Sequence, residues 1–304
     1  DKVMHVEQTP ARMRHTTTVE EQSTLLAGWN QRYAQLSRGA FSGMLSETRL
    51  SGAYLFREVT SRSLLQSGII DEDVLAVGIP VAIKGPARFC GSACGGHQMH
   101  VFSGRCGFEF HTPSDLDIMG IVIPRATLFD HLDRAEAEQV SDRLERAHLL
   151  DLSPALFSRL GQGLRALMDD AAPLDDIAPL LAEALTSAAR LTPPLRSTDL
   201  IGKLREIATD PTRDQPPTIQ EVCDLLGISR RTLQYALQRE LGMSPADYMR
   251  ALPLNAARAR ILDGASVTQA ATLSGFWHFG RFAQDYRTLF GELPSATLQA
   301  NAAQ

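Results

Sequence analysis

The feature that most constrains this 304-residue chain is a repeated pattern in its last third. Residues 218–229, TIQEVCDLLGIS, align with residues 266–277, SVTQAATLSGFW, at an offset of 48 positions. Beyond the glycine turn the offset becomes 49, and both copies continue with the same series of apolar residues, Gly and Pro: Leu233, Leu237, Leu241, Gly242 and Pro245, then Phe282, Tyr286, Phe290, Gly291 and Pro294. An internal repeat of this kind means that one structural unit is used twice.

Each copy has the sequence pattern of a helix-turn-helix unit. Thr218 stands three residues before Glu221, which is a capping-box arrangement that begins a helix. A glycine then supplies the turn, where positive φ is needed, and a second helix is closed by Gly and Pro. The apolar residues of the second helix recur every four positions, so they lie on one face and pack against the core.

The opposite face of each second helix carries the side chains that we expect to contact DNA. Arginine and glutamine have paired donors and acceptors that match the major-groove edges of guanine and adenine. Candidates in the two copies are Ser229, Arg230, Arg231, Thr232, Gln234 and Gln238, then Trp277, His278, Arg281 and Gln284. Trp277 could instead pack on the first helix of its unit, whereas core packing is favoured for Phe276. A glycine-containing helical hairpin is common in ordinary helical proteins, but two copies at this separation favour DNA binding.

A single helix is predicted to join the two units, from Ala246 to about Asp263. About 18 residues at 1.5 Å per residue span about 27 Å. Successive major-groove faces lie about 34 Å apart, so one chain can present two recognition helices to one side of the duplex. Pro253 lies inside this segment, and proline removes a helical hydrogen bond, so either the helix kinks there or a new helix begins at Pro253.

The rest of the chain predicts an α+β protein with four segments. Residues 1–20 are polar and are expected to be flexible. Residues 21–125 contain short apolar runs broken by Gly and Pro, which is typical of a β-barrel or sandwich. Residues 126–195 show leucines at helical spacing and are expected to form connecting helices, with a proline-rich linker near 190–197. Residues 196–304 form the all-α domain with the two helix-turn-helix units.

The charge and the cysteine content of the chain limit which classes of function are possible. The net charge is −5, but from residue 200 onward there are 11 Lys+Arg and 10 Asp+Glu, so the acidic excess lies in the first part of the chain. Whether the chain can bind nucleic acid therefore depends on where its cations are placed, and not on its net charge. Four cysteines give no disulfide framework and favour a reducing compartment. We find no apolar run long enough to span a membrane and no signal peptide, and therefore expect a cytoplasmic protein.

One cysteine- and histidine-rich stretch invites a metal or redox hypothesis. It contains Cys90, Cys94, His97, His100, Cys106 and His111. The spacing does not fit a zinc finger, and on alternating strands neighbours in this set would point to opposite faces. A structural role is therefore predicted, with a metal or redox sensor as the alternative.

Catalysis is not predicted from the sequence. No nucleophile elbow, phosphate-binding loop or dinucleotide fingerprint is present, so we expect neither an enzyme nor a bound cofactor. Arg57 and Glu58 are adjacent in LFREV and could form a buried ion pair or hold a polar effector.

Residues 200–298 closely resemble the AraC/XylS family of transcription regulators. The resemblance rests on GFWHFGRFAQDYRTLFGELPS, through Gly275, Phe276, Phe282, Tyr286, Phe290, Gly291 and Pro294. The same stretch, together with the N-terminal segment that begins LSGAYLFREVT, looks most like the ethanolamine-utilisation regulators. The resemblance implies a cupin-like, barrel-shaped N-terminal domain that binds a small-molecule effector and supports a homodimer. It also implies binding to double-stranded promoter DNA and activation through contact with RNA polymerase.

The chain departs from the family pattern at Pro253, where relatives usually carry a basic residue and continue the helix. Pro253→Arg is therefore predicted to straighten the connector and to raise affinity for an operator.

The sequence thus predicts an effector-responsive transcriptional activator. Three rival hypotheses stay open: a cupin-like metal-binding enzyme or sensor with a helical tail, an architectural DNA-binding protein that needs no effector, and a regulator controlled by a protein partner.

Overall fold

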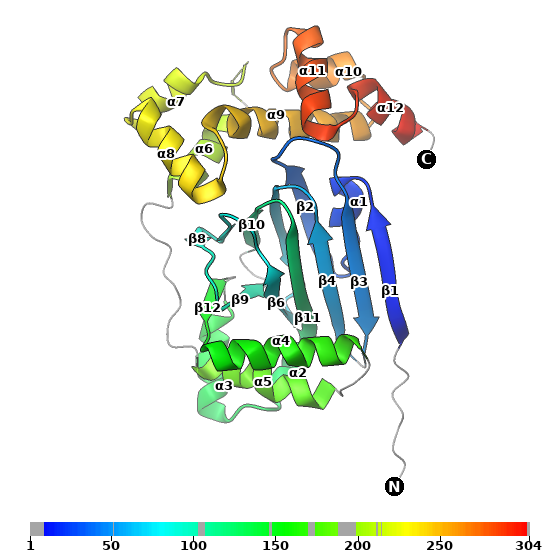
Figure 1. The fold of residues 1–304 in the computed structure, drawn as a ribbon, viewed down its shortest axis with the longest axis vertical. Helices are drawn as coiled ribbons and strands as arrows, with labels where there is room; N and C mark the ends of the chain where they lie inside the picture. The colour runs from blue at the N-terminus through cyan, green and yellow to red at the C-terminus, as the bar shows by residue number, and fades with distance from the viewer. Residues whose placement is uncertain are drawn as a thin grey trace.

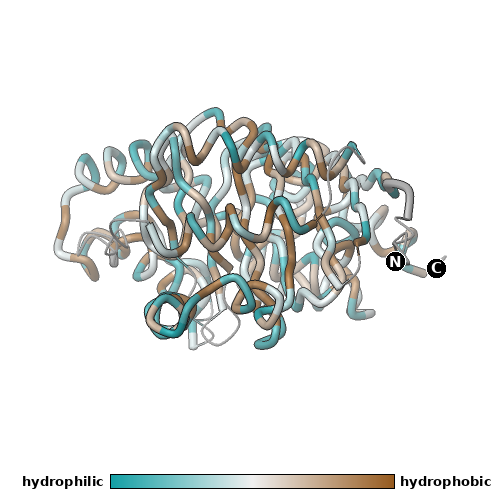
Figure 2. The backbone as a smooth tube through the Cα atoms, turned by 90° about the horizontal axis from the view of Figure 1, so that it is seen from below, coloured by the Kyte–Doolittle hydropathy of each residue, from teal (hydrophilic) through white to brown (hydrophobic). Residues whose placement is uncertain are grey.

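The computed structural model describes residues 9–50, 52–102, 107–145, 148–169, 174–187, 199–210, 212–213 and 215–302. A sheet-rich N-terminal part and a helical C-terminal part are stacked end to end (Figure 1). Within these ranges no helix combines the length and apolar character needed to cross a membrane. Apolar and polar positions instead alternate along the chain (Figure 2). The predicted linker at 190–197 lies outside the described residues.

The N-terminal part contains two antiparallel sheets. The larger has the strand order β1 (Thr9–Thr16), β3 (Gly43–Arg49), β4 (Tyr54–Thr60), β11 (Leu116–Pro124), β6 (Val74–Ala82), β9 (Gln98–Phe102) and β12 (His148–Asp151). The smaller has the order β2 (Trp29–Gln35), β5 (Leu64–Ile70), β10 (Phe108–Thr112), β7 (Arg88–Phe89) and β8 (Ser92–Ala93). Over the described residues the two sheets do not join into one closed ring, so the predicted barrel is wrong. Short apolar strands suit a sandwich as well as a barrel, and the sequence does not encode closure.

The central strands of the larger sheet are buried on both faces, which explains why they are apolar. On β11, Ile118 and Val122 face the smaller sheet, whereas Met119 and Ile121 face a layer of helices. Successive residues of β11 point to opposite faces, and both faces are buried. The run LDIMGIVIP is therefore apolar at almost every position.

The helical layer covers the face of the larger sheet that points away from the smaller sheet (Figure 1). It consists of α2 (Arg125–Phe129), α3 (Arg134–Arg143), α4 (Pro154–Met168) and α5 (Leu174–Ser187). The leucines of α4 at helical spacing are buried, as predicted. Residues 126–195 are not all helical, however, because β12 pairs with β9 at the edge of the larger sheet. The run HLLD is too short for its periodicity to identify a strand.

The predicted flexibility of residues 1–20 is wrong for the part that the structure describes. Strand β1 pairs with β3 over six positions of their register, and α1 (Val19–Ser23) begins directly afterwards. Thr18 caps α1 by accepting a hydrogen bond from the Glu21 backbone N–H. Polar composition misled the prediction because an edge strand exposes much of its surface to solvent.

All the regular secondary structure described in the C-terminal part is helical. It contains α6 (Asp199–Ala208), α7 (Ile219–Leu226), α8 (Arg230–Leu241), α9 (Pro245–Leu262), α10 (Val267–Leu273), α11 (Phe279–Phe290) and α12 (Pro294–Ala302). Helix α9 runs across the end of the sheets, with α7 and α8 at one end of it and α10, α11 and α12 at the other (Figure 1). The predicted single joining helix is confirmed, and it has 18 residues.

Pro253 lies inside α9, which continues through it without interruption. The alternative that a new helix begins at Pro253 is therefore wrong. The ring is buried and lines a cavity of about 200 Å³ together with Leu252 and with Ile207 and Ala208 of α6. The predicted effect of Pro253→Arg on the connector and on operator affinity stays a prediction.

Candidate nucleic-acid interface

The first helix-turn-helix unit consists of α7, a tight turn and α8. Thr218 and Glu221 form the predicted capping box at the start of α7. Gly227 ends the helix with φ of 64°, and the Ile228 N–H donates back to the Cys223 carbonyl at 3.1 Å. This turn requires a residue that tolerates positive φ, which is why glycine stands here.

The second unit, α10 and α11, repeats this local structure. Ser266 and Gln269 form its capping box, and Gly275 has φ of 82°. The Phe276 N–H donates to the Ala271 carbonyl at 2.9 Å, which is the equivalent of the Ile228 bond in the first unit. The repeat therefore corresponds to two copies of one backbone arrangement.

The two second helices bury the faces that the four-residue spacing predicted. Leu233, Leu237 and Leu241 of α8 and Phe282, Tyr286 and Phe290 of α11 are buried in one core built around α9. In the second unit the aromatic rings follow one another along α11, with centroids 4.6 to 5.7 Å apart. Each second helix is thus fixed by its apolar face, and its other face is left to solvent.

The predicted DNA-contacting residues are on that solvent face. All ten are exposed: Ser229, Arg230, Arg231, Thr232, Gln234, Gln238, Trp277, His278, Arg281 and Gln284. Their exposure makes them available to a ligand, and their role in DNA binding stays a prediction.

These side chains differ in what they already contact. Ser229 is the N-cap of α8 and accepts from the Thr232 N–H at 3.1 Å, so both residues have a structural role. Arg230 donates to Gln220 of α7 at 3.0 Å. Arg231 has no hydrogen-bond or ion-pair partner within the described part of the chain. Its guanidinium is therefore the freest of the arginines in the first unit.

In the second unit an acidic residue stands among the candidates. Asp285 lies 3.9 Å from Arg281, one helical turn away, and 3.5 Å from Arg250 of α9. The carboxylate orients Arg281 across the surface of α11. A groove of about 380 Å³ separates the two units here, lined among others by Trp277, His278 and Pro216.

Phe276 was predicted to pack in the core and Trp277 to lie on the surface, and their positions agree with this. Phe276 packs on Phe282 with ring centroids 5.1 Å apart, whereas 53% of Trp277 is exposed.

Gln238 is separated from the other candidates, because it lies in the C-terminal half of α8 and lines a cavity shared with Lys84 and Pro86 of the sheet-rich part.

Sequence reasoning missed one exposed aromatic residue on α8. Tyr235 is 73% exposed and follows Gln234, on the side of the helix away from Leu233 and Leu237. The signal was available, because a residue two positions from each core leucine must face away from the core.

Comparisons with known proteins agree with this geometry. Residues 222–300 match a family model described as a helix-turn-helix domain. XylDLEGF operon transcriptional activator 3 of Pseudomonas putida is 39% identical over 89 residues, which are 28% of this chain and 27% of that protein. The probable thc operon regulatory protein of Rhodococcus erythropolis is 30% identical over 208 residues, which are 62% of this chain and 63% of that protein. These similarities support an AraC-family regulator.

The match covers only part of these AraC-family relatives. The chain spans about a quarter of the length of the Pseudomonas activators, 27% for the one above, and just under two thirds of the Rhodococcus protein. These named relatives are regulators of transcription, not enzymes. The resemblance to ethanolamine-utilisation regulators stays a prediction.

Two solved structures are similar to this chain over different shares of its length. The AraC-like transcriptional activator CuxR is 15% identical, with a TM-score of 0.43, and the match covers 86% of this chain and 98% of that one. A probable AraC family regulator from Rhodopseudomonas palustris is 39% identical, with a TM-score of 0.30, and covers 34% of this chain and 97% of that one.

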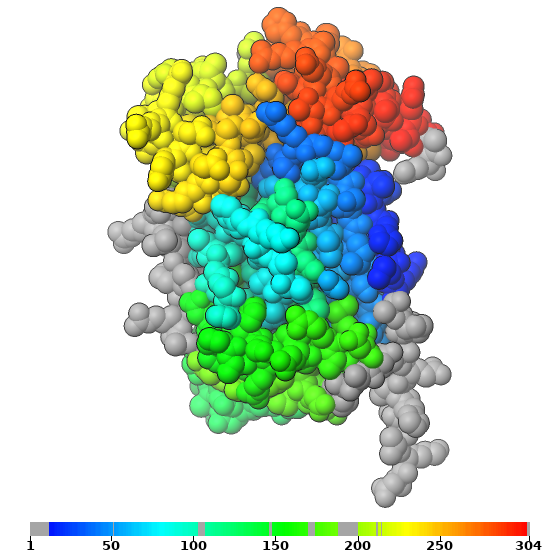
Figure 3. Space-filling model, viewed as in Figure 1, coloured from blue at the N-terminus to red at the C-terminus, as the bar shows by residue number. Residues whose placement is uncertain are grey.

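The helix-turn-helix units rest directly on the sheet-rich part of the chain (Figure 3). For the first unit, the buried Arg88 of β7 forms an ion pair with Glu240 near the C-terminal end of α8. Arg205 of α6 forms a second ion pair with Glu109 of β10. The C-terminal end of α8 is therefore docked on the smaller sheet, and its N-terminal half, with Arg231 and Gln234, is not.

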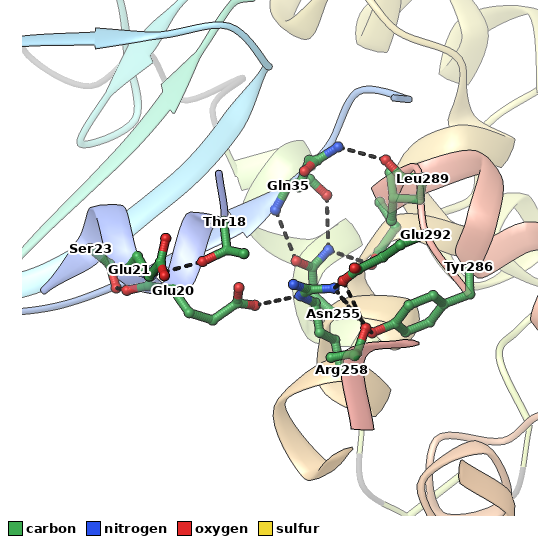
Figure 4. Close-up of polar contacts among 12 residues, drawn as sticks. Thr18, Glu20, Glu21, Ser23, Gln35, Asn255, Arg258, Tyr286, Leu289 and Glu292 are labelled. Carbon is green, nitrogen blue, oxygen red and sulfur yellow. Dashed lines mark hydrogen bonds and ion pairs between the residues drawn. The ribbon is translucent and has the colours of Figure 1, made fainter. Parts of the chain in front are cut away.

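The second unit is docked through a different set of contacts (Figure 4). Arg258 of α9 has 5% of its side chain exposed and donates to Glu20 of α1 at 2.8 Å and to Glu292 at 2.6 Å. Gln35, at the end of β2, donates to the Leu289 carbonyl of α11 at 2.6 Å. The Asn255 side chain forms hydrogen bonds with the Gln35 backbone N–H and C=O, each at 2.8 Å.

The cysteine- and histidine-rich stretch does not converge on one point. Cys94 Sγ lies 3.5 Å from His100 Nε2, while His111 is next to Glu109 and Tyr248. Burial lowers the pKa of His100 to about 3, so this ring is neutral. Over the residues that the structure describes, no three His, Cys, Asp or Glu side chains form a group suited to a metal ion. Cys106 lies outside them.

Arg57 and Glu58 do not pair with each other, so the alternative of a buried ion pair between them is wrong. Successive strand residues point to opposite faces. Arg57 binds Asp117 of β11 through two hydrogen bonds of 2.9 and 2.7 Å. Glu58 points between the sheets, where Tyr33 and Gln22 donate to it.

Proposed function

We propose that this chain is a sequence-specific regulator of transcription that reads double-stranded DNA with α8 and α11. The observation that carries the proposal is the pair of equivalent helix-turn-helix units mounted on one helix, each with an exposed polar face. In helix-turn-helix proteins the N-terminal residues of the second helix contact base edges. Arg231 and Gln234 occupy that part of α8, and His278 and Arg281 occupy that part of α11.

The spacing of the two units supports binding to one duplex. Helix α9 has 18 residues, or about 27 Å, against about 34 Å between successive major-groove faces. The difference is small enough for an adjustment of either unit, or a bend of the DNA, to bring both second helices into register.

Base recognition by the two units would differ. When the two units are aligned at the offset of 49, Arg231 corresponds to Gly280 and Gln234 corresponds to Ala283. The arginine and glutamine that we expect to read bases in the first unit therefore have no equivalent in the second. Because both units lie in one chain and differ in chemistry, the site they read would be asymmetric. Each good bidentate contact would discriminate by about 1–3 kcal/mol.

The remaining functions of the regulator belong to the same proposal. A small molecule bound in the sheet-rich part would change how that part holds the two units, and so change the population able to bind DNA. The names of the Pseudomonas relatives support an activator, which would act through RNA polymerase and as a homodimer. No specific observation favours the metalloenzyme or the architectural protein.

The test is selection of bound sequences from random double-stranded DNA with the purified full chain. We expect an asymmetric motif in two parts whose centres lie about one helical turn apart. Recovery of unselected sequence, or of a single short motif unaffected by changes in α11, would contradict the proposal.

A further inference from the structure

An acidic side chain lies among the residues that the second unit presents to a ligand. Asp285 of α11 lines the groove between the two units together with Trp277 and His278, and 18% of its side chain is exposed. A carboxylate in a surface that binds DNA repels the phosphates, and so it lowers the affinity for every sequence alike. Its presence here therefore needs an explanation.

The fold of a helix-turn-helix unit does not require an acid at this position. When the two units are aligned at the offset of 49, Asp285 corresponds to Ala236 of α8. Both second helices nevertheless pack in the same core, and both end at a glycine with positive φ, Gly242 in α8 and Gly291 in α11. Asp285 is thus a feature of the second unit alone, and the shared fold does not account for it.

The Asp285 carboxylate contacts two arginines through one oxygen. Its Oδ2 lies 3.9 Å from Nε of Arg281 and 3.5 Å from Nε of Arg250 on α9. Because Nε is the atom of Arg281 nearest to the carboxylate, the two terminal nitrogens of this guanidinium lie farther away. Terminal nitrogens of arginine donate together to O6 and N7 of guanine. The ion pair therefore restrains Arg281 and leaves its base-reading edge free.

Arg250 holds the carboxylate from the side of α9. Only 40% of the Arg250 side chain is exposed, against 71% for Arg281. Arg250 also interacts electrostatically with Asp247, one turn earlier on α9, and Asp247 binds Arg38 between β2 and β3 at 2.6 Å. Side chains of alternating charge thus continue from Arg38 to Arg281. Asp285 is fixed by this series before any DNA is bound.

We propose that Asp285 is a positioning residue for base recognition, which holds the Arg281 guanidinium in the direction that reads a guanine. This inference rests on the proposed function, because it assigns a role within the proposed DNA-binding surface. An arginine fixed before binding loses less side-chain entropy when it contacts a base. The same restraint keeps Arg281 from turning to a phosphate, which carries no sequence information. Asp285 therefore lowers the overall affinity and raises the discrimination between sequences.

The first experiment compares Asp285→Asn with the unsubstituted full chain by fluorescence anisotropy, on the selected DNA and its single-base variants. Asparagine keeps the size of the side chain and removes its charge. At the base pair whose preference is lost in Arg281→Ala, we expect the preference to fall about fivefold in Asp285→Asn. Binding to unselected DNA should stay equal or become tighter. An unchanged preference, or equal weakening for every sequence, overturns the proposal.

A charge-matched variant and a double variant show whether Asp285 acts through Arg281. Asp263, at the C-terminal end of α9, is exposed, and its side chain has no hydrogen-bond or ion-pair partner within the described part of the chain. Asp263→Asn should leave the base preference unchanged, and a loss as large as that in Asp285→Asn overturns the proposal. In an Arg281→Ala background, Asp285→Asn should change the preference no further. A further loss there also overturns it.

Two other substitutions at the same position keep the test decisive if Asp285→Asn does not fold. Asp285→Ala introduces the residue that the first unit has at the equivalent position, Ala236, and should lose the same base preference. Asp285→Glu keeps the charge and should retain most of the preference. Equal preferences in the alanine and glutamate variants overturn the proposal, because the carboxylate then has no effect on recognition.

A measurement without DNA separates this inference from the proposed function. The order parameter of the Arg281 Nε–H, obtained from NMR relaxation, reports how strongly the side chain is restrained. We expect a lower order parameter in Asp285→Asn and no change in Asp263→Asn, and equal values in both overturn the proposal. If the chain selects no DNA at all, the proposed function fails, and the order parameter still decides whether Asp285 holds Arg281.

Discussion

The two helix-turn-helix units share their turn and their apolar positions but differ in core side chains, in the cap of the second helix and in docking contacts. The first has leucines in its core, a serine N-cap on α8 and an ion pair between α8 and β7. The second has aromatic residues in its core, no side-chain cap on α11 and a buried arginine that contacts α1. The comparison shows that the repeat preserves the turn and the apolar positions, while the surfaces toward DNA and toward the sheets have diverged.

The difference in docking suggests a division of roles. Contacts to the first unit come from the short hairpin of β7 and β8 and from β10. Contacts to the second unit come from α1 and from the end of β2, which both reach the polar interior of the sandwich. The second unit is therefore the one whose docking contacts share elements with that interior.

The largest effect is expected from removing the arginine that holds the second unit. Arg258→Ala leaves Glu20 and Glu292 without their cation, and breaking a buried pair in this way costs about 3–5 kcal/mol. Urea unfolding of the full chain measures the change. Arg88→Ala is the comparison in the first unit and should cost less, since Arg88 pairs with one carboxylate that Arg239 also contacts. Equal losses would remove the distinction between the two docking modes.

The next effect concerns the two DNA-facing surfaces. Arg231→Ala and Arg281→Ala should each lose discrimination at particular base pairs, by about 1–3 kcal/mol, and at different positions of the bound site. Binding to a series of single-base variants of the selected DNA measures this. Arg159→Ala, on the exposed surface of α4 and paired with Glu183, is the control and should change nothing. Uniform weakening across all sequences would instead assign these arginines to phosphate contacts.

Sequence patterns predicted the C-terminal part well because its determinants are local. A capping residue, a glycine at positive φ and a four-residue apolar spacing each act within one or two helical turns, and these features located α7, α8, α10 and α11. The same reasoning predicted the length of the segment that forms α9 but left open whether the helix continues through Pro253.

The N-terminal part was predicted less completely because its determinants are not local. Alternation indicated strands but not whether two sheets would close into a barrel. Arg57 and Glu58 were adjacent in sequence, yet the strand sends them to opposite faces, toward Asp117 and Tyr33. The contact between Glu20 and Arg258 joins residues 238 positions apart, and no sequence spacing could indicate it.

A smaller effect is expected at Pro253, in the helix that both units share. Pro253→Ala restores a backbone donor inside α9. An interior proline costs a helix about 3 kcal/mol, but loss of the buried ring offsets much of this, so we expect a net gain of about 1 kcal/mol. Thermal unfolding measures the stability, and the selection experiment shows whether the preferred spacing between the two half-motifs changes. A less stable variant would mean that ring packing outweighs the restored hydrogen bond.

The smallest effects separate the two helix starts. Ser229→Ala removes the N-cap of α8 and should cost about 1 kcal/mol, whereas His278→Ser gives α11 the hydroxyl cap it lacks and should add a few tenths of a kcal/mol or more. Both are measured by urea unfolding. If His278→Ser stabilises the chain but weakens its binding to the selected DNA, then position 278 has been kept for recognition at the expense of the helix. If it stabilises the chain and leaves DNA binding unchanged, His278 is not a DNA contact, and recognition by the second unit rests on Trp277, Arg281 and Gln284.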